Sequence, residues 1–231
     1  MNHSNTILVI VAHPDDELLG CGASIAKWTA SGILVHVLIM AEGITSRDVI
    51  RDKYEKSGEL SQLEKLAHQA GKILGVNSVT LLGFPDNRMD SLDRLDVIKA
   101  AEKEIERLKP DTVVTHHSGD LNIDHRIINE AVVTACRPQP ENTVHRILSF
   151  EVPSSTEWQS STSILAFQPN WFEDVSKTID KKIEALKIYQ SEMREWPHSR
   201  SLKNIINLSK YRGSSVGREA VEAFVLLREI K

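Results

Sequence analysis

Hydrophobic residues in this chain form short uninterrupted runs that alternate with longer stretches of helical periodicity. Runs of aliphatic residues, many of them β-branched, predict strands buried on both faces at residues 6–12, 33–41, 78–84 and 111–117. Helical patterns follow them at residues 18–30, 48–74, 92–108 and 124–136. Four strand–helix repeats predict an α/β fold of the Rossmann-like class: a doubly wound, mainly parallel sheet with helices on both faces.

The pattern loosens after residue 146. We expect a strand at 146–152, a polar loop at 153–163, helices at 176–191 and 201–210, and a last strand at 222–230. Trp158, Trp171 and Trp196 lie in this part and are expected in the core. No Pro- and Gly-rich linker, internal repeat or low-complexity tract interrupts the chain, so residues 1–231 are predicted to form a single domain.

Composition excludes several classes of protein. Of the 231 residues, 41% are hydrophobic and 26% are charged, which argues against a membrane protein and against a disordered one. The net charge is −4 without a basic stripe, so a nucleic-acid partner is not expected. Two cysteines without metal-like spacing indicate a reduced intracellular protein. The N-terminus lacks a signal-peptide pattern or an integral membrane segment, and a cytoplasmic location is expected.

Polar residues follow each predicted strand. "HPDDE" follows the first strand, "EGITSR" the second, "PDN" the third and "HHSGDLNIDH" the fourth. In doubly wound sheets ligands bind at the carboxyl ends of the strands. These segments are therefore expected to line one site.

The charged turn after the first strand has the residue types of a zinc site. His13 and Asp16 can converge on one point, and imidazole with carboxylate suits zinc. Asp120, Asp124 and His125 offer further ligands; with His125 the three-ligand count of a catalytic zinc is complete. Asp15 is then free to act as a general base, although it could instead cap the following helix.

Other polar residues are candidates for substrate binding. Arg47 follows the second strand and could hold a sugar hydroxyl or a phosphate. Asp86 in "FPDN" could accept hydrogen bonds from sugar hydroxyls, or could simply form a turn. His116 and His117 end the fourth strand and alternate in direction, so one of them faces the site. We take His117 as the candidate.

The two motifs "AHPDDE" and "GDLNIDH" together resemble the PIG-L/LmbE family of zinc-dependent N-deacetylases, and "AEG", "GFPDN" and "RGSSVGREAVEAF" extend the resemblance over nearly the whole chain. The resemblance implies one Zn²⁺ per chain on His13, Asp16 and His125, with Asp15 as the base. It also implies a small-molecule substrate, an N-acetylglucosamine-type amino sugar that is free or linked to a nucleotide or lipid. Assembly into a homo-oligomer stays open.

One residue departs from the family pattern. Several members carry a histidine three residues before the metal histidine, where it stabilises the oxyanion, whereas this chain has Asn122. An asparagine amide can donate to an oxyanion but cannot serve as a cationic acid. Asn122 is therefore a candidate catalytic residue, with a turn-forming role as the alternative.

Two other functions remain open. A metal-dependent amidase acting on a non-sugar amide would use the same residues. A non-catalytic module that binds a sugar or a nucleotide would leave Asp15 without a task. A dinucleotide site is disfavoured because the first strand is not followed by G-x-G-x-x-G.

Overall fold

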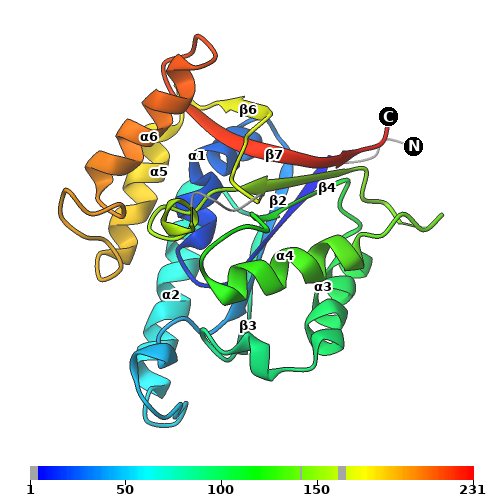
Figure 1. Ribbon diagram of the computed structural model, residues 1–231, viewed down its shortest axis with the longest axis vertical. Coiled ribbons are helices and arrows are strands. Elements are labelled where there is room, and N and C mark those ends of the chain that lie inside the picture. Colours follow the sequence, from blue (N-terminus) through cyan, green and yellow to red (C-terminus); the bar gives the residue numbers. More distant parts are fainter. Residues whose placement is uncertain (1–4, 141, 161–164) are drawn as a thin grey trace.

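The computed structural model describes residues 5–140, 142–160 and 165–231. In these residues seven strands form one sheet, in the order β3-β2-β1-β4-β5-β7-β6 (Figure 1). β1 to β5 run parallel, and β7 is antiparallel to both β5 and β6. The strands are β1 (Thr6–Val11), β2 (Leu34–Ala41), β3 (Ser78–Phe84), β4 (Thr112–His116), β5 (Arg146–Phe150), β6 (Trp171–Asp174) and β7 (Val221–Glu229).

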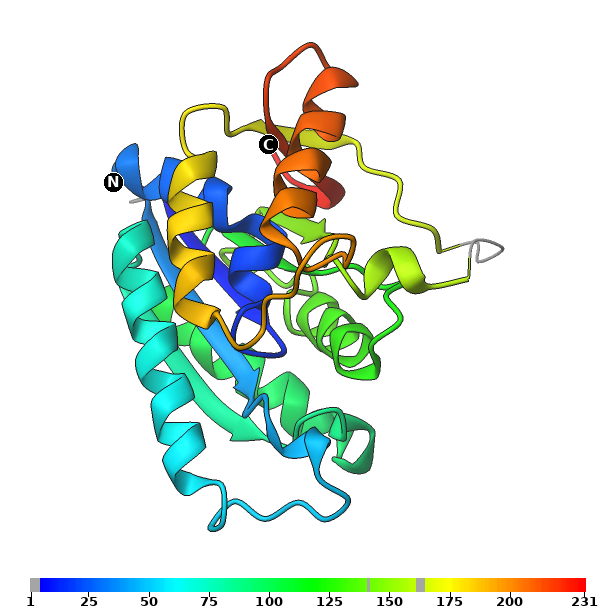
Figure 2. The ribbon, with the colours of Figure 1, turned by 90° about the vertical axis from the view of Figure 1, so that its left-hand side faces the viewer.

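Helices cover both faces of the sheet, which confirms the predicted fold class (Figures 1 and 2). One apolar cluster joins the sheet to α1, α2, α5 and α6, and a second joins the opposite face to α3 and α4. The helices are α1 (Asp16–Ala30), α2 (Ser57–Leu74), α3 (Arg94–Leu108), α4 (Ile123–Ala135), α5 (Ile179–Leu186) and α6 (Leu202–Ser214).

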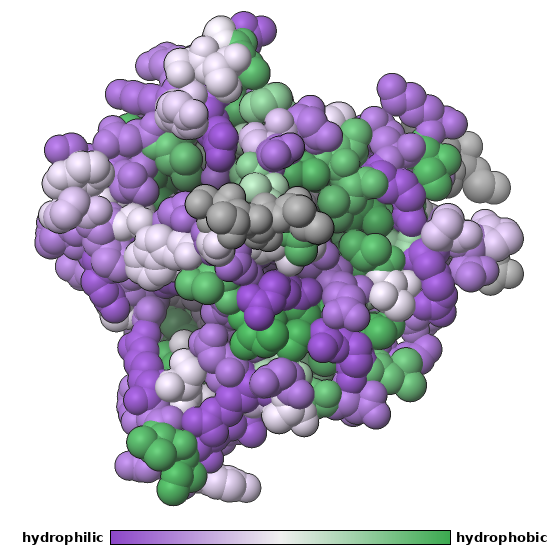
Figure 3. Space-filling view, in the orientation of Figure 1, coloured by the Kyte–Doolittle hydropathy of each residue, from purple (hydrophilic) through white to green (hydrophobic). Residues whose placement is uncertain are grey.

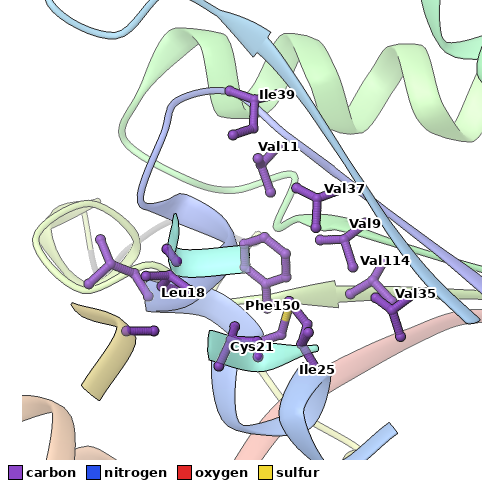
Figure 4. Packing of buried hydrophobic residues seen from close by; sticks show 14 of the residues in the cluster. Val9, Val11, Leu18, Cys21, Ile25, Val35, Val37, Ile39, Val114 and Phe150 are labelled. Carbon is purple, nitrogen blue, oxygen red and sulfur yellow. The ribbon is translucent and has the colours of Figure 1, made fainter. Parts of the chain in front are cut away.

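Phe150 at the end of β5 fixes how closely α1 approaches the sheet. Figure 4 shows its ring between valines of the sheet, such as Val9, and α1 residues such as Cys21. A Cβ atom on Gly20 would lie 2.2 Å from the Phe150 ring. Glycine is therefore needed where the ring meets the helix, and this contact sets the first turns of α1 above the end of β1.

The predicted helix over residues 48–74 is wrong in its first part, because α2 begins at Ser57. The Asp52 carboxylate accepts from the backbone N–H groups of Tyr54 and Glu55, a local turn that competes with a helix. Val49, Ile50 and Tyr54 in this stretch are exposed. Figure 1 draws the chain between β2 and α2 at the lower left, where Figure 3 shows an exposed hydrophobic group.

The C-terminal part differs from the prediction in several further places. β6 was not predicted, and the helix expected over 176–191 is α5 followed by a 3₁₀ turn, Lys187–Tyr189. The predicted polar loop includes the 3₁₀ turn Thr156–Trp158, while its residues 161–163 lie outside the described residues. Trp158 and Trp196 are about half exposed, at 52% and 49%, because they lie in connections beyond the sheet.

Candidate active site

The three predicted metal ligands come together at the carboxyl ends of β1 and β4. Asp16 Oδ2 lies 3.2 Å from His13 Nδ1 and 3.2 Å from His125 Nε2. His13 follows β1, Asp16 begins α1, and His125 lies in the first turn of α4. Asp16 and His125 are buried, while the His13 side chain is 13% exposed. The cluster therefore opens to the outside through His13.

The chemistry of these side chains fits a zinc ion. Ligand atoms about 2.0–2.1 Å from a tetrahedral zinc lie roughly 3.3 Å from one another, close to the separations found here. Asp16 Oδ1 and both ring nitrogens of His125 are buried and make no hydrogen bond of acceptable geometry. Such atoms are costly to bury unless they bind something. Two imidazoles and one carboxylate leave a fourth position open, as catalytic zinc requires.

Three carboxylates lie at the ring nitrogens of the two histidines that do not face Asp16. His13 Nε2 lies 3.1 Å from Asp124 Oδ2 and 3.2 Å from Asp86 Oδ1, and His125 Nδ1 lies 3.2 Å from Asp120 Oδ1. These contacts leave Nδ1 of His13 and Nε2 of His125 for a metal. His13, Asp86 and Asp124 also form a second candidate metal set. The Asp124 oxygens there accept from the backbone N–H groups of Asn87 and Met89, which favours a supporting role.

Charges in the cluster shift its pKa values strongly. Burial opposes the charged form of both imidazoles, but the surrounding carboxylates outweigh it: the pKa of His125 is about 9, and that of His13 is well above its usual value. The same histidines hold the pKa of Asp16 well below its usual range although burial raises it. In the absence of metal, protons on the imidazoles thus balance the buried carboxylate.

Asp15 lies beside the three ligands but outside their set. It precedes α1 with φ = 110°, a conformation that is uncommon for a residue other than glycine, and its side chain makes no capping hydrogen bond. The carboxylate accepts instead from Arg200 Nη1 at 2.8 Å. Burial and the charge of Asp16 raise the pKa of Asp15 to about 7, although Arg200 lowers it. Asp15 is therefore placed to exchange a proton near neutral pH.

Glu17 supports this unusual backbone. Its Oε2 accepts from the Asp15 N–H at 3.0 Å, and its Oε1 accepts from the Tyr189 hydroxyl at 3.3 Å. Burial, together with the charge of Asp15, raises the pKa of Glu17 to about 8. The sequence analysis assigned no role to Glu17, although it belongs to the "HPDDE" motif. Tyr189 and Arg200 were not predicted because they lie far from the motifs.

The two histidines that end β4 have different surroundings. His116 stacks on His125 with ring centroids 3.9 Å apart, and its Nε2 accepts from the Ala12 N–H at 2.8 Å. Burial and the charge of His125 hold the pKa of His116 well below its usual value. The predicted substrate residue, His117, donates to the Leu165 carbonyl at 2.7 Å and packs against Phe167. Of this pair, His116 contacts the metal-ligand cluster.

Asn122 is the N-cap of α4. Its Oδ1 accepts from the Asp124 N–H at 2.8 Å, and its amide donates to Asn87 Oδ1 at 2.7 Å. Both ends of the side chain are thus engaged in holding the loop before α4. A role at an oxyanion requires the bond to Asn87 to break.

The other predicted substrate residues lie around the opening. Asp86 contacts His13, accepts from the Ser46 N–H at 3.0 Å, and is buried. Burial opposes its ionisation, but the hydrogen bond from His13 lowers the pKa of Asp86 to about 2. Arg47 is about half exposed and donates to both oxygens of Glu192, at 2.6 and 2.7 Å. Asp86 is therefore next to the metal ligands, and Arg47 is on the rim.

Two solved structures share the fold over nearly the whole chain. N,N'-diacetylchitobiose deacetylase from Pyrococcus horikoshii superposes with a TM-score of 0.78 at 18% identity, covering 98% of this chain and 85% of that chain. GalB, the 4-carboxy-2-hydroxymuconate hydratase of Pseudomonas putida KT2440, superposes with a TM-score of 0.73 at 20% identity, covering 98% and 96%. At this identity the likeness shows the fold, and the two proteins are named for different reactions.

Sequence comparisons identify the family. The uncharacterized deacetylase YaiS of Escherichia coli K12 is 35% identical over 196 residues, which cover 82% of this chain and 93% of that protein. The probable N-acetyl-alpha-D-glucosaminyl L-malate deacetylase 2 of Bacillus anthracis is 23% identical over 194 residues, 83% of each chain. The family model PIG-L, described as GlcNAc-PI de-N-acetylase, matches residues 8–136. The chain belongs to the PIG-L family.

Proposed function

We propose that this protein is a zinc-dependent N-deacetylase that removes the acetyl group from an N-acetylated amino sugar of the N-acetylglucosamine type. The family and the names of its relatives support a deacetylase. The observation that carries the proposal is the position of Asp15: a buried carboxylate beside the His13–Asp16–His125 set, with a pKa of about 7. A binding module would not need such a group.

His13 Nδ1, Asp16 and His125 Nε2 are the groups that would hold the zinc. A zinc ion there supplies Lewis acidity toward the acetamide carbonyl and the attacking water. Asp15 takes a proton from that water as it attacks the carbonyl carbon, and then gives the proton to the leaving nitrogen. Asp120, Asp124 and Asp86 keep the ligand rings in place during both steps.

The opening supplies groups for the sugar or its carrier. We assign substrate contacts to Arg47 and Asp86; the same role for His117 requires its bond to the Leu165 carbonyl to break. Arg47 would release Glu192 to meet a hydroxyl of the sugar or a phosphate of a linked nucleotide or lipid. No helix within the described residues is long and apolar enough to span a membrane, and we retain a cytoplasmic location as part of the proposal.

A panel of substrates tests the proposal. The zinc-loaded protein is incubated with free, nucleotide-linked and lipid-linked N-acetyl sugars and with non-sugar acetamides, and acetate and free amine are both measured. We expect equal amounts of acetate and amine from one class of N-acetyl sugar, and loss of both in Asp15→Asn with zinc retained. Turnover of the non-sugar amides alone would identify the amidase function instead.

One other outcome would replace this proposal: hydration of a carbon–carbon double bond, the kind of reaction for which GalB is named. The same acid–base group could add water to a carbon–carbon double bond. Hydration of a conjugated dienoate abolishes its ultraviolet absorbance and releases no acetate. Such a result, without amine release from any acetamide, would replace the deacetylase proposal.

A further inference from the structure

Amide hydrolysis passes through a tetrahedral intermediate whose oxygen carries negative charge, and hydrogen-bond donors aimed at that oxygen are worth much to catalysis. The sequence candidate for this task, Asn122, and the candidate substrate residue His117 are both engaged elsewhere. The Asn122 amide donates to Asn87, and His117 donates to Leu165. The site as described therefore requires another donor.

Arg200 has the charge and the position. It comes from the connection between α5 and α6, and its Nη1 lies 2.8 Å from Asp15 Oδ2. Its Nε donates to Ser154 Oγ at 2.6 Å, which fixes the plane of the guanidinium. The side chain is 24% exposed, while Asp15 is 3% exposed. Within the described residues the hydrogen bonds of the Arg200 side chain use Nε and Nη1, so Nη2 can donate to a bound molecule.

We propose that Arg200 is a catalytic residue that donates a charged hydrogen bond from its guanidinium to the oxygen of the tetrahedral intermediate. This inference rests on the proposed deacetylase function. Asp15 must reach the attacking water, and that water must reach the carbonyl carbon at about 3–3.5 Å. A guanidinium in contact with Asp15 therefore lies close to the carbonyl oxygen of a substrate that Asp15 serves.

The movement of charge agrees with this role. When water adds, its oxygen bonds to the carbonyl carbon, its proton passes to Asp15, and the carbonyl electron pair moves onto oxygen. Asp15 becomes neutral as the substrate oxygen becomes negative, so the negative partner of Arg200 shifts from Asp15 to the substrate. The C–N bond then breaks, the oxygen re-forms its double bond, and Asp15 returns the proton to nitrogen. The products are the free amine and acetic acid, which ionises to acetate.

Arg200→Ala, with added guanidinium ion, tests the proposal. We expect kcat to fall by ~10²–10³-fold, KM to change little and zinc content to stay the same. Guanidinium at millimolar concentration should restore part of kcat in Arg200→Ala. Arg194→Ala is the matched control, since Arg194 lies in the same connection and donates to the Ser191 and Met193 carbonyls. It should keep the parent kcat and show no response to guanidinium.

A second readout does not require turnover. Methylphosphonate is a tetrahedral anion that resembles the intermediate, and its binding to the zinc-loaded protein can be measured by calorimetry. Arg200→Ala should weaken this binding at least ~10-fold, and Arg194→Ala should not. A parent-like kcat in Arg200→Ala, or unchanged methylphosphonate binding, would refute the proposal; a lowered Tm alone would make Arg200 a tether of its connection. If the parent releases no acetate from any substrate, the proposed function fails, and the binding result still decides whether Arg200 meets a tetrahedral anion.

Discussion

The buried ion pair of Lys182 and Glu222 is predicted to hold together α1, the helix that begins at the candidate metal site. α1 is broken at Cys21, where φ is −146°. Glu222 of β7 accepts from the Ala23 and Ser24 N–H groups at 3.1 and 2.6 Å, so it caps the second half of α1. Lys182 of α5 donates to the Leu19 carbonyl at 2.8 Å and to Glu222 at 2.6 Å.

The size of the effect follows from burial. Lys182 and Glu222 are 4% and 5% exposed, and each satisfies backbone groups as well as its partner. Removing one member leaves the other charge buried and unpaired, which costs about 3–5 kcal/mol. We therefore expect Lys182→Met and Glu222→Gln each to lower the free energy of unfolding by that amount. In the double variant no buried charge remains, so its loss should be smaller than the sum of the two.

Urea unfolding of the parent, both single variants and the double variant gives the coupling energy. Lys181→Met is the control, because Lys181 is exposed and pairs with Glu184 on the surface of α5; it should change stability by less than about 1 kcal/mol. Additive losses in the double variant, or single losses no larger than that of the control, would show that the pair does not hold the broken turn.

Four further predictions concern the site itself. His13→Ala, Asp16→Ala and His125→Ala should each lose zinc by metal analysis, and full retention in all three would remove the metal site. Asp15→Asn should keep zinc and lose turnover by ~10²–10⁴-fold; in the parent, kcat/KM should rise with pH through about 7 as Asp15 ionises, and a profile flat from pH 5 to 9 would contradict its role as base. Burial raises the pKa of Glu17 from 4.5 to about 8, so the free energy of unfolding of the parent should fall as pH rises from about 4.5 to 8. Glu17→Gln should remove this fall. Urea unfolding at several pH values checks it, and an equal fall in parent and variant would contradict it. Asn122→Ala should lower the free energy of unfolding by about 1 kcal/mol, the usual contribution of an N-cap. A ~10²-fold loss of kcat with unchanged stability would instead indicate that Asn122 donates to the oxyanion.

The parallel half of the fold could be predicted because its sequence pattern is local. Strands buried on both faces read as continuous apolar runs, and the strand ends matched within a few residues. Residues 48–56 misled the prediction since exposed Val49, Ile50 and Tyr54 imitate a helical period. The Arg88 side chain also donates to the Asp48 and Val49 carbonyls, a contact that only the folded chain contains. β6 is four residues long, too short for a periodic signal.

The site was predictable only where strand ends bring residues together. The rule that ligands bind at the carboxyl ends of parallel strands was enough to join His13 and Asp16 to His125. Alternation along β4 could not decide between His116 and His117, because that choice depends on which face α4 covers. No sequence pattern indicated Arg200, which lies 185 residues from Asp15 in a connection without a motif. Its contact with Asp15 depends on the fold of the C-terminal part, where the strand and helix pattern is weak.

The candidate site thus has two origins in the chain. The proposed zinc ligands, their supporting carboxylates and Asp15 all lie within the part matched by the family model, residues 8–136. The side chains that support these residues come from after residue 136. Thr156 donates to Asp120 at 2.6 Å, Tyr189 donates to Glu17, and Arg200 donates to Asp15. The rim residue Glu192 has the same origin. A change in the C-terminal part would therefore alter these supporting contacts without altering the candidate zinc ligands themselves. The candidate zinc ligands and the proposed substrate contacts Arg47 and Asp86 thus lie before residue 146, whereas Arg200 and the residues that hold Asp120 and Glu17 lie after it.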